Sequence, residues 1–234
     1  MTIRGVAHRG YPKKYPENTM SGFQAALDLQ YDHLELDVHL SKDGVPVVIH
    51  DPTVDRVTNG TGYVQDFTLA ELKQLVVKDV ERIPTLEEVL SLVKGQIIVD
   101  IELKQAGAYA PKLEEQTLEV VQKLDMLDEV FFTSFDHYAM LKLRSLSADA
   151  QLGIINYGCT PSAFDFLKQI NGQYLSMNHV YFSEYYLHEC VDRGIQLILW
   201  TVDQAARMET LSAYPDLLVC TNELERWKPF GTDR

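Results

Sequence analysis

Cysteine is scarce in this chain, with three residues among 234. Cys159, Cys190 and Cys220 lie too far apart to build the framework of paired disulfides that holds small secreted folds together. The sequence also has no pair of closely spaced cysteines of the kind that marks a zinc knuckle. We expect three ordinary buried thiols, so the chemistry of this protein must come from other side chains.

Long apolar runs and an excess of basic residues are absent too. No stretch reaches the roughly 18 apolar residues that span a bilayer, and residues 1–10 have no apolar targeting region. We therefore expect a cytoplasmic protein without stable membrane insertion. The net charge of −13 argues against a nucleic acid or an anionic membrane surface as partner, because both bind basic patches. An anionic substrate would need a local cationic pocket.

Short apolar runs alternate with amphipathic stretches, and no linker or repeat separates them. The runs that predict strands are Ile3–His8, His33–His39, Ile97–Glu102, Val130–Ser134, Leu152–Asn156, Tyr174–Asn178, Gln196–Thr201 and Leu217–Thr221. The stretches that predict helices are Ser21–Gln30, Leu86–Lys94, Leu113–Leu124, His137–Leu146, Pro161–Ile170, Glu184–Arg193 and Gln204–Ala213. Thr85 with Glu88 predicts a capping box, Asp136 predicts an N-cap, and Gly194 predicts a helix end.

This alternation predicts a parallel sheet with right-handed crossovers. Eight such units close naturally into a (β/α)8 TIM barrel of about this length, and 234 residues suit one domain that spans 1–234. The alternative is an open, doubly wound sheet. Such a sheet usually has fewer strands and often has a glycine-rich phosphate turn, which this sequence lacks, so we favour the barrel.

One segment departs from the alternation of strands and helices. Val45–His50 follows the turn signal Lys42-Asp43-Gly44 and predicts an antiparallel return from the second strand. Residues 51–83 then include the turn-rich stretch Thr58-Asn59-Gly60-Thr61-Gly62. We interpret 51–83 as a short insertion on the catalytic rim of the barrel, not as a second domain.

Carboxylates gather at the ends of predicted strands, where the active sites of such barrels lie. Glu35 and Asp37 share one face of the second strand because strand side chains alternate with period two, and Glu102 lies on the polar face of the third. Three carboxylates offer the hard oxygen ligands that suit Mg²⁺ or Ca²⁺ better than zinc. The alternative is a salt-bridged cluster with Arg9 and Lys104.

Two histidines and three further side chains at strand ends are candidates for the rest of a site. His8 and His50 end two apolar runs and are candidates for a general acid and a general base; a polar rim residue is the alternative for either one alone. Arg9 and Lys104 are candidate phosphate contacts. Trp200 is a candidate wall of a substrate pocket, with plain packing as the alternative.

These residues belong to motifs that resemble those of the glycerophosphodiester phosphodiesterase family nearly from end to end. In chain order the motifs are His8-Arg9-Gly10, Pro16-Glu17-Asn18-Thr19, Glu35-Leu36-Asp37-Val38, Ser41-Lys42-Asp43-Gly44, His50-Asp51, Glu102-Leu103-Lys104, Ser134-Phe135 and Trp200-Thr201-Val202. Any one of them is weak. Their order, together with the insertion after the fifth, makes the set specific.

The resemblance implies a (β/α)8 barrel that hydrolyses a small-molecule glycerophosphodiester to glycerol 3-phosphate and an alcohol. It implies one divalent cation, Mg²⁺ or Ca²⁺. The implied roles are metal ligation by Glu35, Asp37 and Glu102, acid–base catalysis by His8 and His50, phosphate binding by Arg9 and Lys104, a substrate contact by Trp200, and support by Glu17 and Asn18. The chain departs from the family at Asn222, where an aspartate often follows the threonine, and this loses a carboxylate at the rim.

Two other functions compete with this one. A phospholipase D-like or lysophospholipid-cleaving relative would need an apolar groove or a membrane-facing surface, and the sequence shows neither. A binding module that captures phosphodiesters without cleaving them predicts the loss of a histidine or a carboxylate, and all are present. The short insertion favours an open site and a small, soluble substrate. The head group, the roles of the two histidines, a cyclic intermediate and the oligomeric state stay open.

Overall fold

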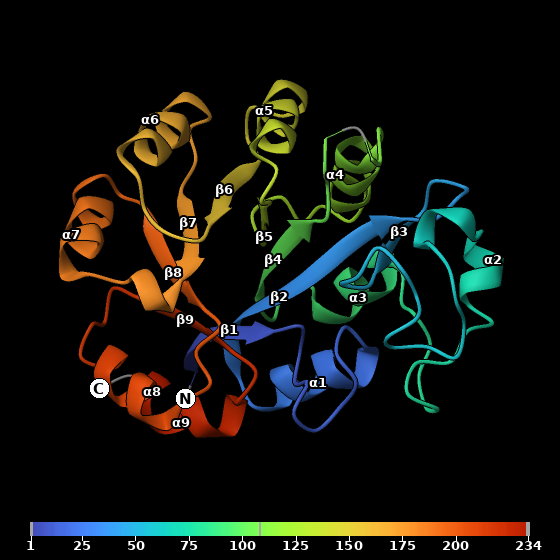
Figure 1. Ribbon diagram of the computed structural model, residues 1–234, viewed down its shortest axis with the longest axis horizontal. Coiled ribbons are helices and arrows are strands. Elements are labelled where there is room, and N and C mark those ends of the chain that lie inside the picture. Colours follow the sequence, from blue (N-terminus) through green and yellow to red (C-terminus); the bar gives the residue numbers. More distant parts are fainter. Residues whose placement is uncertain (1, 108, 233–234) are drawn as a thin grey trace.

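Parallel strands close into a barrel in the computed structural model, which describes residues 2–107 and 109–232 (Figure 1). The strands of the barrel are β1 (Ile3–His8), β2 (Tyr31–Leu40), β4 (Ile98–Leu103), β5 (Val130–Thr133), β6 (Gln151–Asn156), β7 (Tyr174–Asn178), β8 (Gln196–Trp200) and β9 (Leu218–Thr221). Strand β1 pairs in parallel with both β2 and β9, which closes the ring. The predicted TIM barrel is confirmed, and the open sheet is excluded.

Helices cover the outside of the barrel (Figure 1). They are α1 (Met20–Asp28), α3 (Leu86–Val93), α4 (Leu113–Lys123), α5 (His137–Leu146), α6 (Pro161–Gln169), α7 (Glu184–Asp192), α8 (Ala205–Leu211) and α9 (Leu224–Gly231). A short 3-10 helix, η2 (His179–Tyr181), precedes α7. Helix α9 was not predicted, because Pro229 interrupts its apolar pattern. Within the described part of the chain, no helix has the length and apolar character needed to cross a membrane.

The predicted helix signals appear at the expected places. The backbone N–H of Glu88 donates to Thr85 Oγ1 at 3.1 Å, and the backbone N–H of Thr85 donates to Glu88 Oε2 at 2.7 Å. Asp136 accepts a hydrogen bond from the backbone N–H of Tyr138 at 3.0 Å. Gly194 has a φ of +66°, the left-handed conformation that glycine adopts after helices at little cost. Local chemistry therefore determines these helix ends.

The segment after β2 forms one side of the rim. Strand β3 (Pro46–Val48) pairs antiparallel with the end of β2, as the turn signal predicted. The chain then passes through η1 (Val64–Asp66) and α2 (Leu69–Leu72) before it reaches α3. Buried apolar residues of this segment pack with those of β3 in a small cluster of their own. In Figure 1 the segment lies beside the carboxyl end of β2, so its loops face the mouth of the barrel.

The inside of the barrel is apolar at one end and polar at the other. In β2, alternate residues such as Leu34 and Leu36 belong to the large core shared with the helices. Phe131 and Tyr174 lie near the amino ends of their strands. Their rings stack with centroids 3.8 Å apart and fill the interior of the barrel at that end. Charged side chains are thereby left to the carboxyl end of the barrel, where the site lies.

Candidate active site

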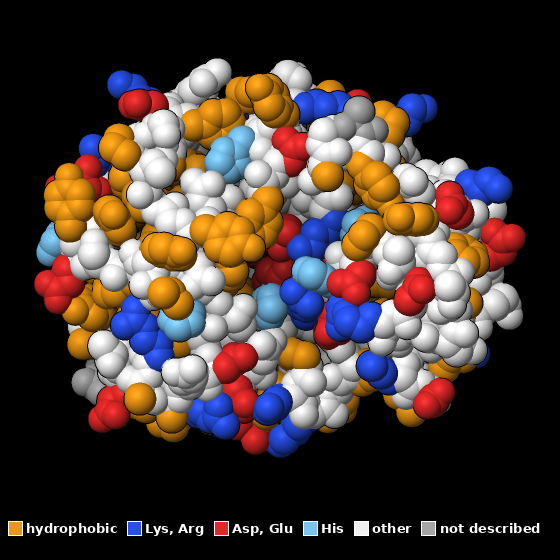
Figure 2. Space-filling view, in the orientation of Figure 1, with side chains coloured by type: hydrophobic (Ala, Val, Ile, Leu, Met, Phe, Trp, Pro, Cys, Tyr) orange, Lys and Arg blue, Asp and Glu red, His pale blue; other side chains and the backbone are white. Residues whose placement is uncertain are grey.

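A cavity of about 240 Å³ opens at the carboxyl ends of the strands. Its lining divides into a charged side with His8, Arg9, Glu35, His50, Glu102 and Lys104 and an aromatic side with Phe135, Tyr157 and Trp200. Figure 2 shows acidic, basic and histidine side chains gathered in this hollow next to a hydrophobic area. A larger hollow of about 860 Å³ lies between α6 and α7, but no histidine lines it. The smaller cavity is therefore the candidate active site.

The three predicted metal ligands come together on two neighbouring strands. Asp37 of β2 lies opposite Glu102 of β4 in the sheet register, and Glu35 is two residues earlier on the same face of β2. One oxygen from each carboxylate lies within 4.8 Å of the other two. All three are buried. Burial raises the pKa of Glu35, and it raises the pKa of Glu102 to about 7, because a charged carboxylate loses its hydration there.

Two cations face these carboxylates. Lys104 Nζ lies 2.9 Å from Asp37 Oδ1 and 2.5 Å from Glu102 Oε1. Arg9 Nε lies 3.3 Å from Asp37 Oδ2. Burial alone would raise the pKa of Asp37, but Lys104 and Arg9 outweigh it and hold that pKa well below its usual range. The ion pairs of the alternative interpretation are therefore present, and they centre on Asp37.

These ion pairs leave Glu35 incompletely satisfied. Glu35 Oε2 accepts the backbone N–H of Arg9 at 2.8 Å, while Glu35 Oε1 is buried without a hydrogen-bond partner among the described residues. A buried acceptor without a donor is costly unless a cation or water meets it. An all-oxygen donor set with one open acceptor fits a hard divalent cation such as Mg²⁺ or Ca²⁺. Glu35, Asp37 and Glu102 are thus the residues that could hold a metal.

The turn after β1 explains how Arg9 reaches Glu35. Arg9 has a φ of 55° and Gly10 a φ of 81°, so both lie in the left-handed region. A Cβ on Gly10 would come within 2.8 Å of the Gly22 carbonyl carbon, which leaves room for glycine alone. The strained Arg9 backbone is held where its N–H donates to Glu35. The motif His8-Arg9-Gly10 is therefore needed for the conformation of the turn as well as for its side chains.

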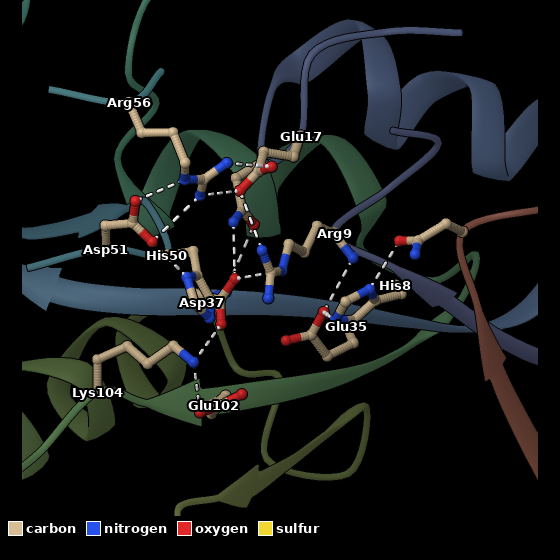
Figure 3. Close-up of polar contacts among 12 residues, drawn as sticks. His8, Arg9, Glu17, Glu35, Asp37, His50, Asp51, Arg56, Glu102 and Lys104 are labelled. Atoms are coloured by element: carbon tan, nitrogen blue, oxygen red, sulfur yellow. Dashed lines mark hydrogen bonds and ion pairs between the residues drawn. The ribbon is translucent and has the colours of Figure 1, made fainter. Parts of the chain in front are cut away.

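His50 lies just after β3 and is oriented by the residue that follows it. His50 Nδ1 lies 2.6 Å from Asp51 Oδ1. A carboxylate only accepts hydrogen bonds, so Nδ1 carries the proton and Nε2 is left for the cavity. Burial lowers the pKa of His50, while the charge of Asp37 and the hydrogen bond to Asp51 act in the opposite direction. The Asp51 carboxylate is held in turn by Arg56 (Figure 3).

His8, at the end of β1, is oriented by a different kind of group. Its Nδ1 lies 2.7 Å from Asn222 Oδ1. The Asn222 amide cannot be reversed, because its Nδ2 donates to Asp203 Oδ2 at 2.7 Å. His8 Nδ1 therefore carries the proton, and Nε2 points toward Glu35, 4.0 Å from its Oε2. Burial, helped by Arg9, lowers the pKa of His8 to about 4, so the ring is neutral at neutral pH.

The supporting residues of the motif at 16–19 also have identifiable contacts. Asn18 Nδ2 donates to Asp37 Oδ2 at 2.7 Å. Glu17 Oε1 accepts a hydrogen bond from Arg9 Nη1 at 3.1 Å. Asn18 thus orients one of the three carboxylates, and Glu17 orients the guanidinium beside it.

The aromatic side of the cavity is larger than the sequence indicated. Phe135, Tyr157 and Trp200 follow or end β5, β6 and β8, and their ring centroids lie 5.6–5.9 Å apart in tilted and edge-to-face pairs. Phe135 is 46% exposed and Tyr157 is 65% exposed. An exposed aromatic wall therefore lines the site, of which the sequence indicated only Trp200. Each aromatic residue is ordinary alone, and only the barrel brings the three together.

Sequence reasoning assigned no role in the site to four polar residues near it. Asp100 lies two residues before Glu102 on the same face and accepts a hydrogen bond from Thr133 Oγ1 at 2.6 Å. Asp203 and Asn222 stand behind His8, and Arg56 stands behind His50. A carboxylate is therefore still present near this part of the rim. It belongs to Asp203, which is hydrogen-bonded to Asn222 and reaches His8 only through the Asn222 side chain. Asp100 had a sequence signal in its place on the polar strand face, and Asn222 had one in its place at the rim, whereas Asp203 and Arg56 had none.

Known proteins resemble this chain in sequence and in fold. A family model described as the glycerophosphoryl diester phosphodiesterase family matches residues 8–226. The glycerophosphodiester phosphodiesterase of Caldanaerobacter subterraneus is 36% identical over 216 residues, which cover 88% of each chain. The solved glycerophosphodiester phosphodiesterase of Thermotoga maritima superposes with a TM-score of 0.77 at 27% identity and 96% coverage of each chain.

A second solved structure shows the same fold. An Oleispira antarctica phosphodiesterase in complex with the product sn-glycerol-3-phosphate gives a TM-score of 0.87 at 23% identity. The match covers 98% of this chain and 96% of the other. Because the family model and the Caldanaerobacter relative both span most of the sequence, the chain belongs to the glycerophosphoryl diester phosphodiesterase family, a family of phosphoric diester hydrolases.

Proposed function

We propose that this protein hydrolyses glycerophosphodiesters to glycerol 3-phosphate and an alcohol, with one divalent cation, Mg²⁺ or Ca²⁺, held by Glu35, Asp37 and Glu102. The observation that carries the proposal is the meeting of three buried carboxylate oxygens within 4.8 Å of one another in the cavity that His8 and His50 also line. The Oleispira relative, with its bound sn-glycerol-3-phosphate, supports the same substrate class.

The carboxylates explain why a cation belongs here. Two cationic side chains cannot neutralise three carboxylates, and Glu35 Oε1 has no donor among the described residues. When bound, a divalent ion would supply the missing charge and act as a Lewis acid toward a phosphoryl oxygen. Lys104 and Arg9 remain beside it and add positive charge where the phosphate enters, which offsets the negative net charge of the chain.

The surroundings of the two histidines divide the acid–base work. His8 is neutral, and its unprotonated Nε2 faces the cavity because the protonated Nδ1 donates a hydrogen bond to Asn222 Oδ1. It therefore takes the proton of the attacking oxygen, whether this belongs to water or to a glycerol hydroxyl. His50 Nε2 also starts unprotonated, but the Asp51 carboxylate at Nδ1 stabilises the doubly protonated ring. His50 therefore takes up a proton from solvent at Nε2 and gives it to the oxygen of the departing alcohol, while the proton that His8 removed returns to solvent.

The remaining residues orient the substrate. Glu17 and Asn18 support Arg9 and Asp37 through the hydrogen bonds described above. Trp200, with Phe135 and Tyr157, forms the wall against which the glycerol carbons or the alcohol pack. We also propose that 1–234 is one catalytic domain and that 51–83 is its short rim insertion, since the loops of this segment carry Asp51 and Arg56 to the mouth.

The test is the release of glycerol 3-phosphate from glycerophosphocholine, glycerophosphoethanolamine and glycerophosphoglycerol. We expect release with Mg²⁺ or Ca²⁺ and none in excess EDTA. Substrate binding without release would favour the non-catalytic binding module. The exposed aromatic wall makes lysophosphatidylcholine a necessary member of the panel, and faster cleavage of this lipid than of glycerophosphocholine would favour the lysophospholipid-cleaving alternative.

A further inference from the structure

Arg56 lies in the rim insertion and is bound by two carboxylates at once (Figure 3). Its Nη1 and Nη2 donate to Glu17 Oε2 and Oε1 at 2.8 and 2.7 Å. Its Nε and Nη2 donate to Asp51 Oδ2 and Oδ1 at 2.6 and 3.1 Å. A single exposed ion pair contributes little to stability. A guanidinium that forks onto two carboxylates fixes the positions of both.

Each of these carboxylates holds a residue of the proposed active site. Asp51 Oδ1 accepts a hydrogen bond from His50 Nδ1 at 2.6 Å, and Glu17 Oε1 accepts one from Arg9 Nη1 at 3.1 Å. Arg56 itself is not among the residues that line the cavity, and its three nitrogens are all engaged by carboxylates. It is therefore placed to act on the substrate through other side chains and not by touching it.

We propose that Arg56 is a positioning residue that locks His50 and Arg9 into their working orientations through Asp51 and Glu17. This inference rests on the proposed function. Without Arg56, two carboxylates would face each other across the gap that its guanidinium fills, and they would repel. Asp51 would then turn away from His50, and the imidazole would be free to rotate and to change the nitrogen that carries its proton.

The charges agree with this arrangement. The hydrogen bonds from Arg56 are the main reason why the pKa of Asp51 falls to about 2. Burial acts to raise the pKa of Glu17, but Arg56 and Arg9 together bring it below its usual value. Both carboxylates thus stay ionised and remain hydrogen-bond acceptors over the whole pH range in which a histidine can work.

The first test compares steady-state kinetics with glycerophosphocholine and saturating Mg²⁺ or Ca²⁺. Arg56→Ala should lower kcat about 10–100-fold, as loss of an outer partner of a catalytic group does, and should change KM less than about threefold. Arg56→Lys keeps the charge but cannot fork onto both carboxylates, so it should recover only part of kcat. Arg193→Ala is the matched control: Arg193 is similarly exposed and ion-paired with Glu189 at 3.0 Å, at the C-terminal end of the outer helix α7.

The second test asks whether Arg56 acts through His50. In the His50→Ala background, Arg56→Ala should cost much less than it does in the wild type, because most of its effect is already lost. Histidine side-chain ¹⁵N NMR gives a readout that does not depend on turnover. The His50 ring should show one protonated Nδ1 in the wild type and a mixture of tautomers in Arg56→Ala.

Three results would overturn the inference: an unchanged kcat in Arg56→Ala, an equal loss of kcat with and without His50, or an unchanged His50 tautomer. A lower melting temperature with unchanged kcat and NMR signals would also overturn it, because Arg56 would then only stabilise the fold. Failure of the proposed function looks different. The wild type would then release no glycerol 3-phosphate, while the tautomer measurement would still decide the role of Arg56.

Discussion

The stability of the metal-free protein depends on the buried carboxylates, and Glu102→Gln tests this dependence. The pKa of Glu102 is raised to about 7 by burial, although Lys104 acts in the opposite direction. A raised pKa means that the folded protein binds a proton which the unfolded chain releases near pH 4.5. The folded state therefore loses stability as pH rises from 4.5 to 7. The glutamine has nearly the same size and no charge, so the variant escapes this loss.

The size of the effect follows from the shift in pKa. From 4.5 to about 7 is about 2.5 pH units, and each unit is worth 1.36 kcal/mol, which gives about 3 kcal/mol. Relative to the wild type, the variant should gain about this much unfolding free energy between pH 4.5 and pH 8. For a chain of this length that corresponds to about 6–12 °C in melting temperature. Any change in packing contributes equally at both pH values, so the difference between them isolates the charge.

The assay is urea unfolding of both proteins in EDTA at pH 4.5, 6, 7 and 8, followed by repetition with Ca²⁺ or Mg²⁺. With metal the order should reverse at pH 8, because the ion binds the folded wild type and stabilises it. A difference that does not change with pH, or a variant that weakens relative to the wild type as pH rises, would refute the reasoning. Either outcome would mean that the Lys104 ion pair outweighs burial and that the site is a salt-bridged cluster.

Three further predictions concern catalysis and binding. His8→Ala and His50→Ala should each lower kcat by about 10²–10⁴-fold at an unchanged unfolding midpoint, as measured by glycerol 3-phosphate release and urea titration. Trp200→Ala should raise KM for glycerophosphocholine by roughly tenfold, because the pocket loses an aromatic wall; an unchanged KM would return Trp200 to plain packing. Asn222→Asp should lower kcat at pH 8, because the new carboxylate would face Asp203. Adding Asp203→Asn should restore much of the loss, whereas simply additive losses would contradict the hydrogen-bond chain behind His8.

The barrel and the meeting of the three carboxylates were predictable because strand geometry is regular. Once β2 and β4 are recognised as strands, period two puts Glu35 and Asp37 on one face and Glu102 on the matching face of its own strand. The structure then adds only the distances between them. Helix α9 was missed for the opposite reason, since Pro229 breaks the periodic signal on which such predictions depend.

Residues on loops carry no such periodicity, and Arg56 shows the consequence. Its partner Glu17 is 39 residues away in sequence, in a different loop. Nothing in either stretch predicts that the two loops meet. Their meeting depends on how the insertion, with its own apolar cluster, packs at the rim of the barrel.

The environment of His8 depends on the closure of the barrel. Asn222 is 214 residues away in sequence, yet Ala7 lies opposite Thr221 in the pairing of β1 with β9, so the two residues that follow are neighbours. A (β/α)8 prediction implies that the first and last strands pair, but it does not fix their register. A shift of one residue would replace Asn222 by Thr221 or Glu223 and would place a different group behind the imidazole. The chemistry of His8 is thus determined by strand register, which only the folded chain reveals.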